Sequence, residues 1–131
     1  MFNTLPPENN PSLLIVDDEP AIVEMLEMLL EDDFKVTGCS DPTQALQMAQ
    51  QALPAVVMVD VMMPALNGIQ ILKNLRNVPS LSKIPVVLMT AGTNFNGLNE
   101  TELKDLKAWV VKKPFDNYKL MDLLKELSAV A

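Results

Sequence analysis

Short apolar segments alternate along this chain with longer stretches whose apolar residues recur at helical spacing. An apolar run without polar alternation is typical of a strand covered on both faces, so the short segments predict strands. These segments are Leu13–Asp17, Lys35–Cys39, Ala55–Asp60, Ile84–Thr90 and Trp109–Lys112. The stretches that predict helices are Glu19–Asp32, Pro42–Gln51, Gly68–Asn77, a short segment that begins near Asn99 or Thr101, and Asp116–Ala129. Five strands in alternation with five helices predict an α/β fold with one doubly wound parallel sheet.

Apolar residues on the first and last predicted helices form stripes that are expected to pack on the sheet. The first stripe contains Ile22, Met25, Leu26 and Leu29, and the last contains Leu120, Leu123, Leu124 and Leu127. The last stripe is too short for a coiled-coil seam. Five methionines are expected at core-facing positions and need no cofactor to explain them: Met25, Met28, Met48, Met58 and Met89.

Turn-forming residues are concentrated at the start of the chain. Residues 1–11 are polar and include three prolines, which predicts a flexible leader before a single domain at 12–131. This start has neither a basic segment nor an apolar core, so it does not resemble a signal peptide. The apolar runs, such as Pro54–Val59, are too short to cross a bilayer. We therefore expect a cytoplasmic domain that does not act at a membrane.

Composition changes this picture mainly through charge. With 49% hydrophobic and 21% charged residues among 131, the chain has the composition of a globular protein. Its formal net charge of −7 opposes binding to phosphate backbones and anionic membranes. We therefore expect no direct binding of nucleic acid.

Two scarce residue types limit the available chemistry. The one cysteine, Cys39, excludes an internal disulfide, fits a reducing compartment and is expected to be buried at a strand end. The absence of histidine excludes Ser-His and Cys-His catalysis, histidine-ligated zinc and a phosphohistidine of the chain's own. Chemistry here therefore depends on carboxylates, hydroxyls, lysines or a metal ion bound by oxygen.

Polar residues of several kinds stand at the carboxyl ends of the predicted strands. Asp17 and Asp18 come at the end of the first strand, Asp60 ends the third, Thr90 ends the fourth, and Lys113 follows the fifth. Ligands of doubly wound sheets bind outside these ends, so the side chains are expected to converge. The ordinary polarity of strand ends explains one or two of them but not all five.

Clustered carboxylates repel one another, so they must either take up protons or bind a cation. The expected cation is Mg²⁺ before Ca²⁺, because a calcium loop needs closely spaced acids in one segment and these come from two strands. Mg²⁺ keeps some waters and accepts phosphate oxygens, which indicates a phosphoryl group as the third component. Asp60 could itself accept that group as an acyl phosphate, with Lys113 and Thr90 placed to bind its oxygens.

Four motifs in register resemble the receiver domains of bacterial response regulators, the signalling family that includes the chemotaxis regulators. They are VDDEP at the first strand, VDVMMPALNG around Asp60, LMTAG at the fourth strand and KKPF after the fifth. The resemblance runs from about Ser12 to Ala129. It implies a flavodoxin-like fold with five strands in the order 2-1-3-4-5 and five helices.

The resemblance assigns roles to the acidic residues and the lysine. Asp60 would be the phospho-acceptor. Asp18, Asp60 and the backbone carbonyl of Met62 would bind Mg²⁺, and Asp17 would act mainly through a metal-bound water. Lys113 would pair with the phosphoryl group.

The resemblance also gives expectations for the loops around these residues. Thr90 would move toward the phosphoryl group and carry the loop after the fourth strand with it. The Lys113–Pro114 bond would be the family's cis peptide. Pro64 and Gly68 would shape the turn after Asp60, since proline fixes φ and glycine allows close approach.

The implied function is that of a phosphorelay receiver in two-component signal transduction. A histidine kinase or a histidine phosphotransfer protein would donate the phosphoryl group, and the change at Asp60 would switch binding to a downstream output protein or domain. Such a receiver catalyses its own phosphorylation and dephosphorylation rather than acting as a conventional enzyme. Dimerisation through the face of helices 4 and 5 is one form that the switch could take.

Three features depart from the family pattern, and Met62 separately bears on the lifetime of the acyl phosphate. The position three before Lys113, which is usually aromatic, is Val110, and a one-residue shift could let Trp109 substitute. The stretch Gly92–Asn99 is rich in Asn and Gly, which shortens helix 4. Leu106-Lys107 replaces a small-residue pair before the fifth strand. Met62 stands where a polar side chain could position an attacking water, which predicts a long-lived acyl phosphate.

Three alternatives belong to other functional classes. A degenerate receiver could act as a constitutive interaction module. A phosphatase of the haloacid dehalogenase type would need a general acid at position 62, where the chain has Met62. A flavodoxin-like electron carrier would need a hydroxyl- or glycine-rich loop after the first strand and aromatic residues around a flavin, for which Trp109 and Tyr118 are the only candidates beyond phenylalanine.

Overall fold

A computed structural model describes residues 10–63, 66–91 and 97–129. The strands are β1 (Ser12–Val16), β2 (Lys35–Cys39), β3 (Val56–Asp60), β4 (Val86–Thr90) and β5 (Ala108–Lys112). The helices are α1 (Pro20–Leu30), α2 (Ala45–Ala52), α3 (Gly68–Arg76), α4 (Glu100–Asp105) and α5 (Asn117–Ser128). Two 3₁₀ turns, Pro42–Gln44 and Pro79–Leu81, precede α2 and β4. The predicted alternation of five strands and five helices is therefore confirmed.

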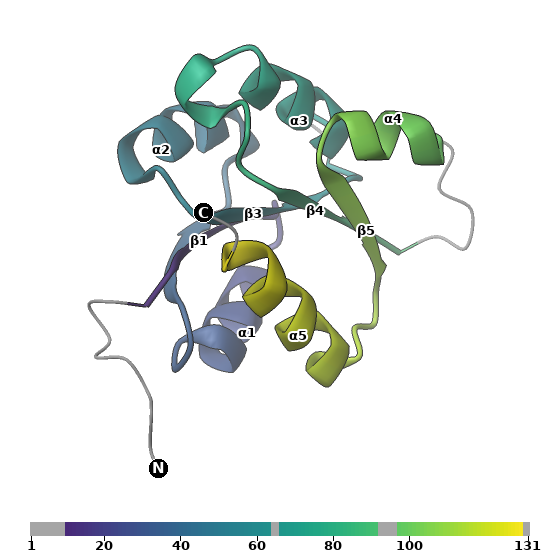
Figure 1. Ribbon diagram of the computed structural model, residues 1–131. Coiled ribbons are helices and arrows are strands. Elements are labelled where there is room, and N and C mark those ends of the chain that lie inside the picture. The colour runs from purple at the N-terminus through teal and green to yellow at the C-terminus, as the bar shows by residue number, and fades with distance from the viewer. Residues whose placement is uncertain (1–9, 64–65, 92–96, 130–131) are drawn as a thin grey trace.

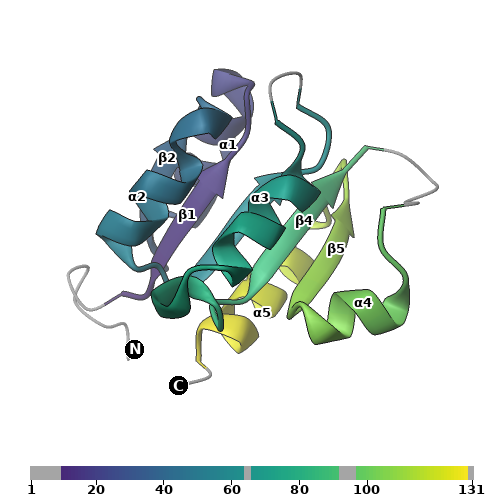
Figure 2. The ribbon, with the colours of Figure 1, turned by 90° about the horizontal axis from the view of Figure 1, so that it is seen from above.

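The five strands form one parallel sheet in the order β2-β1-β3-β4-β5, as predicted. Helices α1 and α5 cover one face, and α2, α3 and α4 cover the other (Figure 1). Figure 2 shows the second layer from above, with α2 and α3 over the strands and α4 beside the start of β5. The strand order reverses between β1 and β3, so the carboxyl ends of these two strands lie next to each other. Within the described residues, no helix is both long enough and apolar enough to cross a membrane.

Each face of the sheet has its own apolar core. Strands β3 and β4 are buried along their whole length, which explains their unbroken apolar sequences. The α5 stripe packs as predicted, with Leu120, Leu124 and Leu127 buried and Leu123 partly buried. Cys39 is buried at the end of β2, also as predicted, and burial is the main reason that its thiol pKa is raised.

The prediction that Met25 and Met28 face the core is wrong, since their side chains are 46% and 75% exposed. Helix α1 instead buries Val23, Leu26 and Leu30. At about 100° per residue these three define the inward direction, and Met25 and Met28 point to the opposite side. The other three methionines agree with the prediction: Met58 and Met89 are buried and Met48 is partly buried.

Helix α4 is short, as the sequence predicted, and has six residues. Its N-terminus is fixed by a capping box, in which the Asn99 side chain accepts a hydrogen bond from the Glu102 N–H and the Glu102 carboxylate accepts one from the Asn99 N–H. Residues 92–96 of the Asn- and Gly-rich stretch lie outside the described residues, as do residues 1–9 of the predicted leader.

The Arg76 side chain links α3 to the segments that enter β4 and β5 through hydrogen bonds to the backbone. Its guanidinium donates hydrogen bonds of 2.6–3.3 Å to four backbone carbonyls, those of Leu81, Ile84, Leu106 and Lys107. Lys107 has a φ of 53°, in the left-handed region. Glycine would adopt this conformation without strain, whereas a residue with a Cβ atom such as lysine does not.

We expect Lys107→Gly to raise the free energy of unfolding by about 1 kcal/mol. Glycine removes the left-handed strain of roughly 1–2 kcal/mol, and part of this gain is lost to the greater entropy of the unfolded chain. Urea denaturation measures the difference. Lys107→Ala is the matched control, since it removes the charged side chain but keeps Cβ, and it should show no gain. Equal stabilities of the two variants would contradict the explanation.

Candidate functional site

The sheet brings the predicted site residues together at its carboxyl edge. Asp60 ends β3 and Thr90 ends β4, while Asp17 and Lys113 directly follow β1 and β5. Adjacent strand ends are held in register by the pairs Val16–Val59, Asp60–Met89 and Thr90–Lys112. Three of these side chains are buried although they are polar: Asp17, Asp60 and Thr90 are 0%, 5% and 5% exposed. The predicted convergence is therefore present in the structure.

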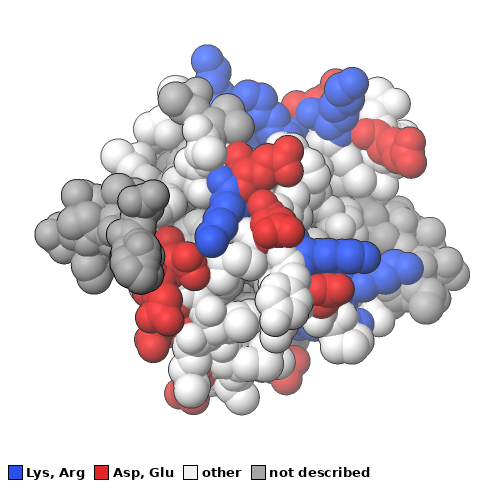
Figure 3. Space-filling model, turned by 60° about the horizontal axis from the view of Figure 1, so that its bottom comes forward, with Lys and Arg blue, Asp and Glu red and all other residues white. Residues whose placement is uncertain are grey.

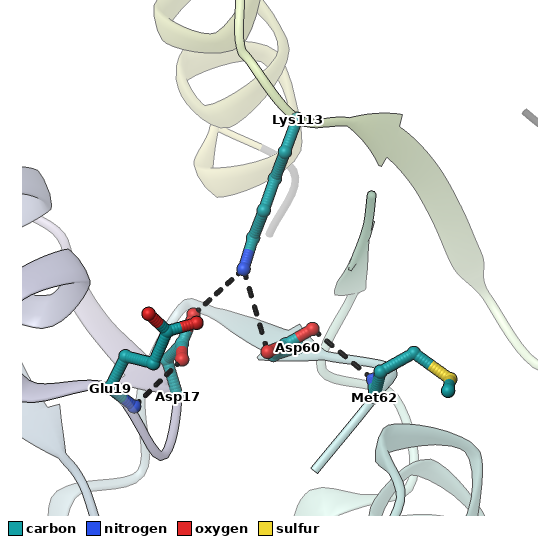
Figure 4. A network of polar contacts seen from close by, with 5 residues as sticks. All are labelled: Asp17, Glu19, Asp60, Met62 and Lys113. Atoms are coloured by element: carbon teal, nitrogen blue, oxygen red, sulfur yellow. Dashed lines mark hydrogen bonds and ion pairs between the residues drawn. The ribbon is translucent and has the colours of Figure 1, made fainter. Parts of the chain in front are cut away.

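Lys113 joins the two buried carboxylates. Its Nζ lies 3.1 Å from Asp17 Oδ2 and 3.4 Å from Asp60 Oδ2 (Figure 4). The backbone N–H of Lys113 donates a 2.8 Å hydrogen bond to the Thr90 carbonyl, and the Lys113–Pro114 bond is cis, as expected. Burial alone would lower the pKa of Lys113, but the hydrogen bond to Asp17 and the charges of both carboxylates raise it overall. The side chain is thus held as a cation between two acids.

The surroundings of Asp60 disfavour the ionised form of its carboxyl group. Its pKa is raised, first by burial and then by the charge of Asp17, while Lys113 and the Met62 N–H act in the opposite direction. The Met62 N–H donates a 3.2 Å hydrogen bond to Asp60 Oδ1, so the loop after β3 turns back over the carboxylate. A buried acid with this environment readily accepts a positively charged or electrophilic ligand.

Gly68 makes the turn after Asp60 possible. A Cβ atom at this position would lie 2.5 Å from the Asp60 carbonyl oxygen and 3.0 Å from Val59 Cγ1, so any side chain would push α3 away from β3. The predicted role of Gly68 in close approach is consistent with this packing. Pro64, which was expected to share that role, lies outside the described residues.

Three consecutive acidic residues stand where Lys113 contacts Asp17, which is the first of them. Asp17, Asp18 and Glu19 each offer one carboxylate oxygen, and these atoms lie within 4.8 Å of one another. Asp17 is buried, Asp18 is half-buried and Glu19 is exposed. All of these donors are oxygen atoms, and a single ammonium offsets the two buried acids, so the site has the chemistry of a hard divalent cation site. Asp17 and Asp18 were predicted from the sequence; Glu19 was missed, although it is the next residue in the same motif.

Thr90 and the position of the missing aromatic residue share one face of the sheet. Val110 pairs with Leu88 in register, and Thr90 pairs with Lys112, so strand alternation places the side chains of Thr90 and Val110 on the same face. Val110 is partly buried in the core beneath α2, α3 and α4. Trp109 faces the other side of β5 and is 38% exposed. Trp109 therefore does not occupy the place of the missing aromatic side chain in this structure.

The surface charges are mixed on the face drawn in Figure 3. Among the described residues, acidic side chains and lysine or arginine side chains are interspersed there. This pattern differs from the continuous basic stripe that is typical of a nucleic-acid-binding surface.

Comparison with known proteins gives a consistent result. The family model of the response regulator receiver domain matches residues 13–125. Among curated relatives, the response regulator Rre1 of Synechocystis sp. is 37% identical over 123 residues, which are 90% of this chain and 52% of the relative. The response regulator PleD of Caulobacter vibrioides is 35% identical over 121 residues, which are 88% of this chain and 26% of the relative. The chain spans about half or less of the length of these relatives.

Solved structures agree with the family match. The chemotaxis protein CheY4 of Vibrio cholerae has a TM-score of 0.80 at 28% identity, covering 90% of this chain and 98% of that one. A putative response regulator from Chloroflexus aurantiacus has a TM-score of 0.81 at 28% identity, covering 92% and 99%. The receiver domain of the sensor kinase PA1611 from Pseudomonas aeruginosa, described with a magnesium ion in its active-site cleft, shares the fold at 21% identity, with a TM-score of 0.77 and coverage of 91% and 98%.

Because the pKa of Asp60 is raised, the contribution of this residue to the free energy of unfolding depends on pH. In the folded chain Asp60 holds its proton more tightly than in the unfolded chain, so its contribution to stability falls as the pH rises from the unfolded pKa through the folded one. We expect Asp60→Asn to raise the free energy of unfolding by about 1 kcal/mol at pH 7 without divalent cations. The gain should shrink as the pH falls through the raised pKa of the wild-type carboxyl, because the charge is then lost in the folded state.

Urea denaturation at several pH values, followed by Trp109 fluorescence, tests this expectation. Asp122→Asn removes an exposed carboxylate from α5 and serves as the control. A gain of equal size in both variants, or one that grows as the pH falls, would contradict the burial argument.

Proposed function

Since this chain belongs to the receiver domain family of response regulators, the modules of two-component signalling, we propose that Asp60 accepts a phosphoryl group from a partner's phosphohistidine in a Mg²⁺-dependent reaction. The observation that carries this proposal is the contact of Lys113 with both Asp17 and Asp60 at the carboxyl edge of the sheet. It brings together the carboxylate that we propose as acceptor, the ammonium that we propose to bind phosphate, and one acid of the proposed metal site.

In the proposed transfer, an Asp60 carboxylate oxygen attacks the phosphorus atom. The new bond is P–O to Asp60, and the bond that breaks is P–N to the donor imidazole, which keeps the electron pair. Lys113 would bind one phosphoryl oxygen, and the Thr90 hydroxyl and the Met62 N–H would donate hydrogen bonds to others. Attack requires an ionised Asp60, and the Lys113 ammonium favours the ionised form against the effect of burial.

The residues that would hold Mg²⁺ are Asp18, Asp60 and the backbone carbonyl of Met62, with Asp17 acting through a bound water. When bound, the ion would neutralise charge on the transferring phosphoryl oxygens. Support comes from the oxygen-only donor set and from the two buried acids, Asp17 and Asp60, which share a single ammonium. The magnesium ion described for the PA1611 receiver domain is consistent with such a site.

The proposed partners follow from the residues that the chain lacks. Without histidine it needs a histidine kinase or a histidine phosphotransfer protein as donor, which fits a cytoplasmic setting. A groove of about 830 Å³ between α4, β5 and α5, lined in part by Leu103, Trp109, Val110 and Leu127, is a candidate surface for the output partner or for dimerisation. The curated relatives are longer than this chain. We propose that a downstream output protein or domain responds to the state of Asp60.

One observation favours a second candidate function. Val110 has no aromatic ring with which to follow Thr90, so the domain could bind its partner constitutively, as a degenerate receiver. The intact set of Asp17, Asp60 and Lys113 favours the phosphorelay role. The membership of the receiver family leaves no support for the phosphatase and electron-carrier alternatives.

Phosphorylation by a small donor tests the proposal directly. We expect incubation with acetyl phosphate and Mg²⁺ to add the mass of one phosphoryl group, because a carboxylate, an ammonium and hydrogen-bond donors lie together at the proposed site. Intact-mass spectrometry measures the product, and the gain should disappear in Asp60→Ala and in the presence of EDTA. A wild-type chain that gains no mass, or an Asp60→Ala variant that gains as much, would refute the proposal.

The side chain at position 62 is expected to set the lifetime of the acyl phosphate. Met62 is 74% exposed, and its side chain extends away from Asp60 (Figure 4), so it offers no good acceptor for an attacking water. We expect Met62→Asn to lose its phosphoryl group several-fold faster than wild type, because an amide can orient that water. The intact mass followed over time gives the rate. Met28→Asn, an exposed substitution on α1, should match wild type; equal rates in all three chains would contradict this role.

A further inference from the structure

Glu19 is placed as a helix cap but does not use its side chain as one. It is the N-cap residue of α1, and its backbone N–H donates a 3.0 Å hydrogen bond to Asp17 Oδ1. Among the described residues its carboxylate accepts no cap hydrogen bond from the helix. The carboxylate lies instead within 4.8 Å of those of Asp17 and Asp18. Figure 4 shows it beside Asp17.

Among the described residues the two buried carboxylates, Asp17 and Asp60, have polar partners, whereas the Glu19 carboxylate has no ion-pair partner. Asp17 is wholly buried, and its two oxygens accept hydrogen bonds from the Glu19 N–H and the Lys113 ammonium. Within the described part of the chain, the ion pairs at this site join Lys113 to Asp17 and Asp60 and leave Glu19 without a cationic partner. An exposed carboxylate on the solvent side of the acidic cluster can therefore reach a cation without breaking an existing contact.

We infer that Glu19 is a specificity-determining residue of the divalent cation site and that it strengthens the binding of Ca²⁺ more than that of Mg²⁺. This inference rests on the proposed function, because the cation site is the one that serves Asp60. Mg²⁺ demands octahedral geometry, keeps several waters and commonly takes one or two carboxylates, which Asp18 and Asp60 already supply. Ca²⁺ accepts six to eight oxygens in a flexible arrangement, so a third carboxylate can join its ligands directly.

A purely structural role for Glu19 makes a different prediction. A negative charge at the N-terminus of α1 stabilises the helix through its dipole, and the first turn of α1 has no other acid. Such a role would change the stability of the fold when the charge is removed. It would not change the ratio of the Ca²⁺ and Mg²⁺ affinities.

Calorimetric titration of the chain with MgCl₂ and with CaCl₂ separates the two roles. We expect Glu19→Gln to weaken Ca²⁺ binding about tenfold and Mg²⁺ binding about two- to threefold. The matched control is Glu24→Gln, which removes the same charge from an exposed position of α1 and should change both affinities less than twofold. Equal effects of the two variants, or a loss of the same factor for both cations in Glu19→Gln, would overturn the inference.

The same samples show which hypothesis has failed if one fails. Mass gain of the wild-type chain with acetyl phosphate and Mg²⁺ reports on the proposed function, whereas cation titration without a phosphodonor reports on Glu19. A wild-type chain that is phosphorylated on Asp60, together with an unchanged cation ratio in Glu19→Gln, refutes only the role of Glu19. The opposite outcome refutes only the phosphorelay role. In it, the wild-type chain binds both cations and Glu19→Gln shows the expected change in the ratio of their affinities, but the wild-type chain takes no phosphoryl group.

Discussion

The contact of Lys113 with Asp17 and Asp60 is the interaction on which the arrangement of this molecule depends. Two buried carboxylates on neighbouring strands would repel each other, and burial already raises the pKa of Asp60. A single ammonium from the far edge of the sheet, 3.1 and 3.4 Å from the two acids, offsets that repulsion. The sheet order makes this geometry possible, because β1 and β3 are adjacent and the segment after β5 turns back toward them. The ion pair is thus a weak source of net stability and a strong constraint on position.

The opposite end of the sheet is fixed by a different device. Arg76 donates to four backbone carbonyls where the chain enters β4 and β5, so it holds the start of these strands and the end of α4. Helix α4 buries none of its own residues fully, but Leu103 packs partly buried against the core, and Arg76 binds the carbonyl of the C-cap residue Leu106. The edge of the sheet that carries β5 is therefore fixed at both ends, by Arg76 at one and by Lys113 at the other.

The sequence was sufficient to predict most of the fold and much of the site, because both depend on strand ends. Apolar runs mark where the buried strands lie, and the first polar residue after each run falls on the same edge of a parallel sheet. The errors have a common cause: a linear pattern gives spacing but not direction. Met25 and Met28 fit an apolar stripe, yet the inward direction of α1 is set by Val23, Leu26 and Leu30. Glu19 and Trp109 likewise required coordinates, since the Glu19 carboxylate lies with those of Asp17 and Asp18 and the Trp109 side chain faces away from Thr90.

The same geometry limits how a change at Asp60 could reach a partner. Thr90 and Val110 are on one face of adjacent strands, and Val110 belongs to the close-packed core that also contains Leu88 and Leu103. A β-branched side chain has little rotamer freedom, so it cannot follow Thr90 by rotating as a larger aromatic side chain could. Displacement at Thr90 would instead be transmitted through contacts of that core to α4, since close-packed interiors transmit strain rather than absorb it. The proposed capture of a phosphoryl group and its proposed relay would therefore depend on different parts of the chain, and Val110 departs from the family pattern on the side of the relay.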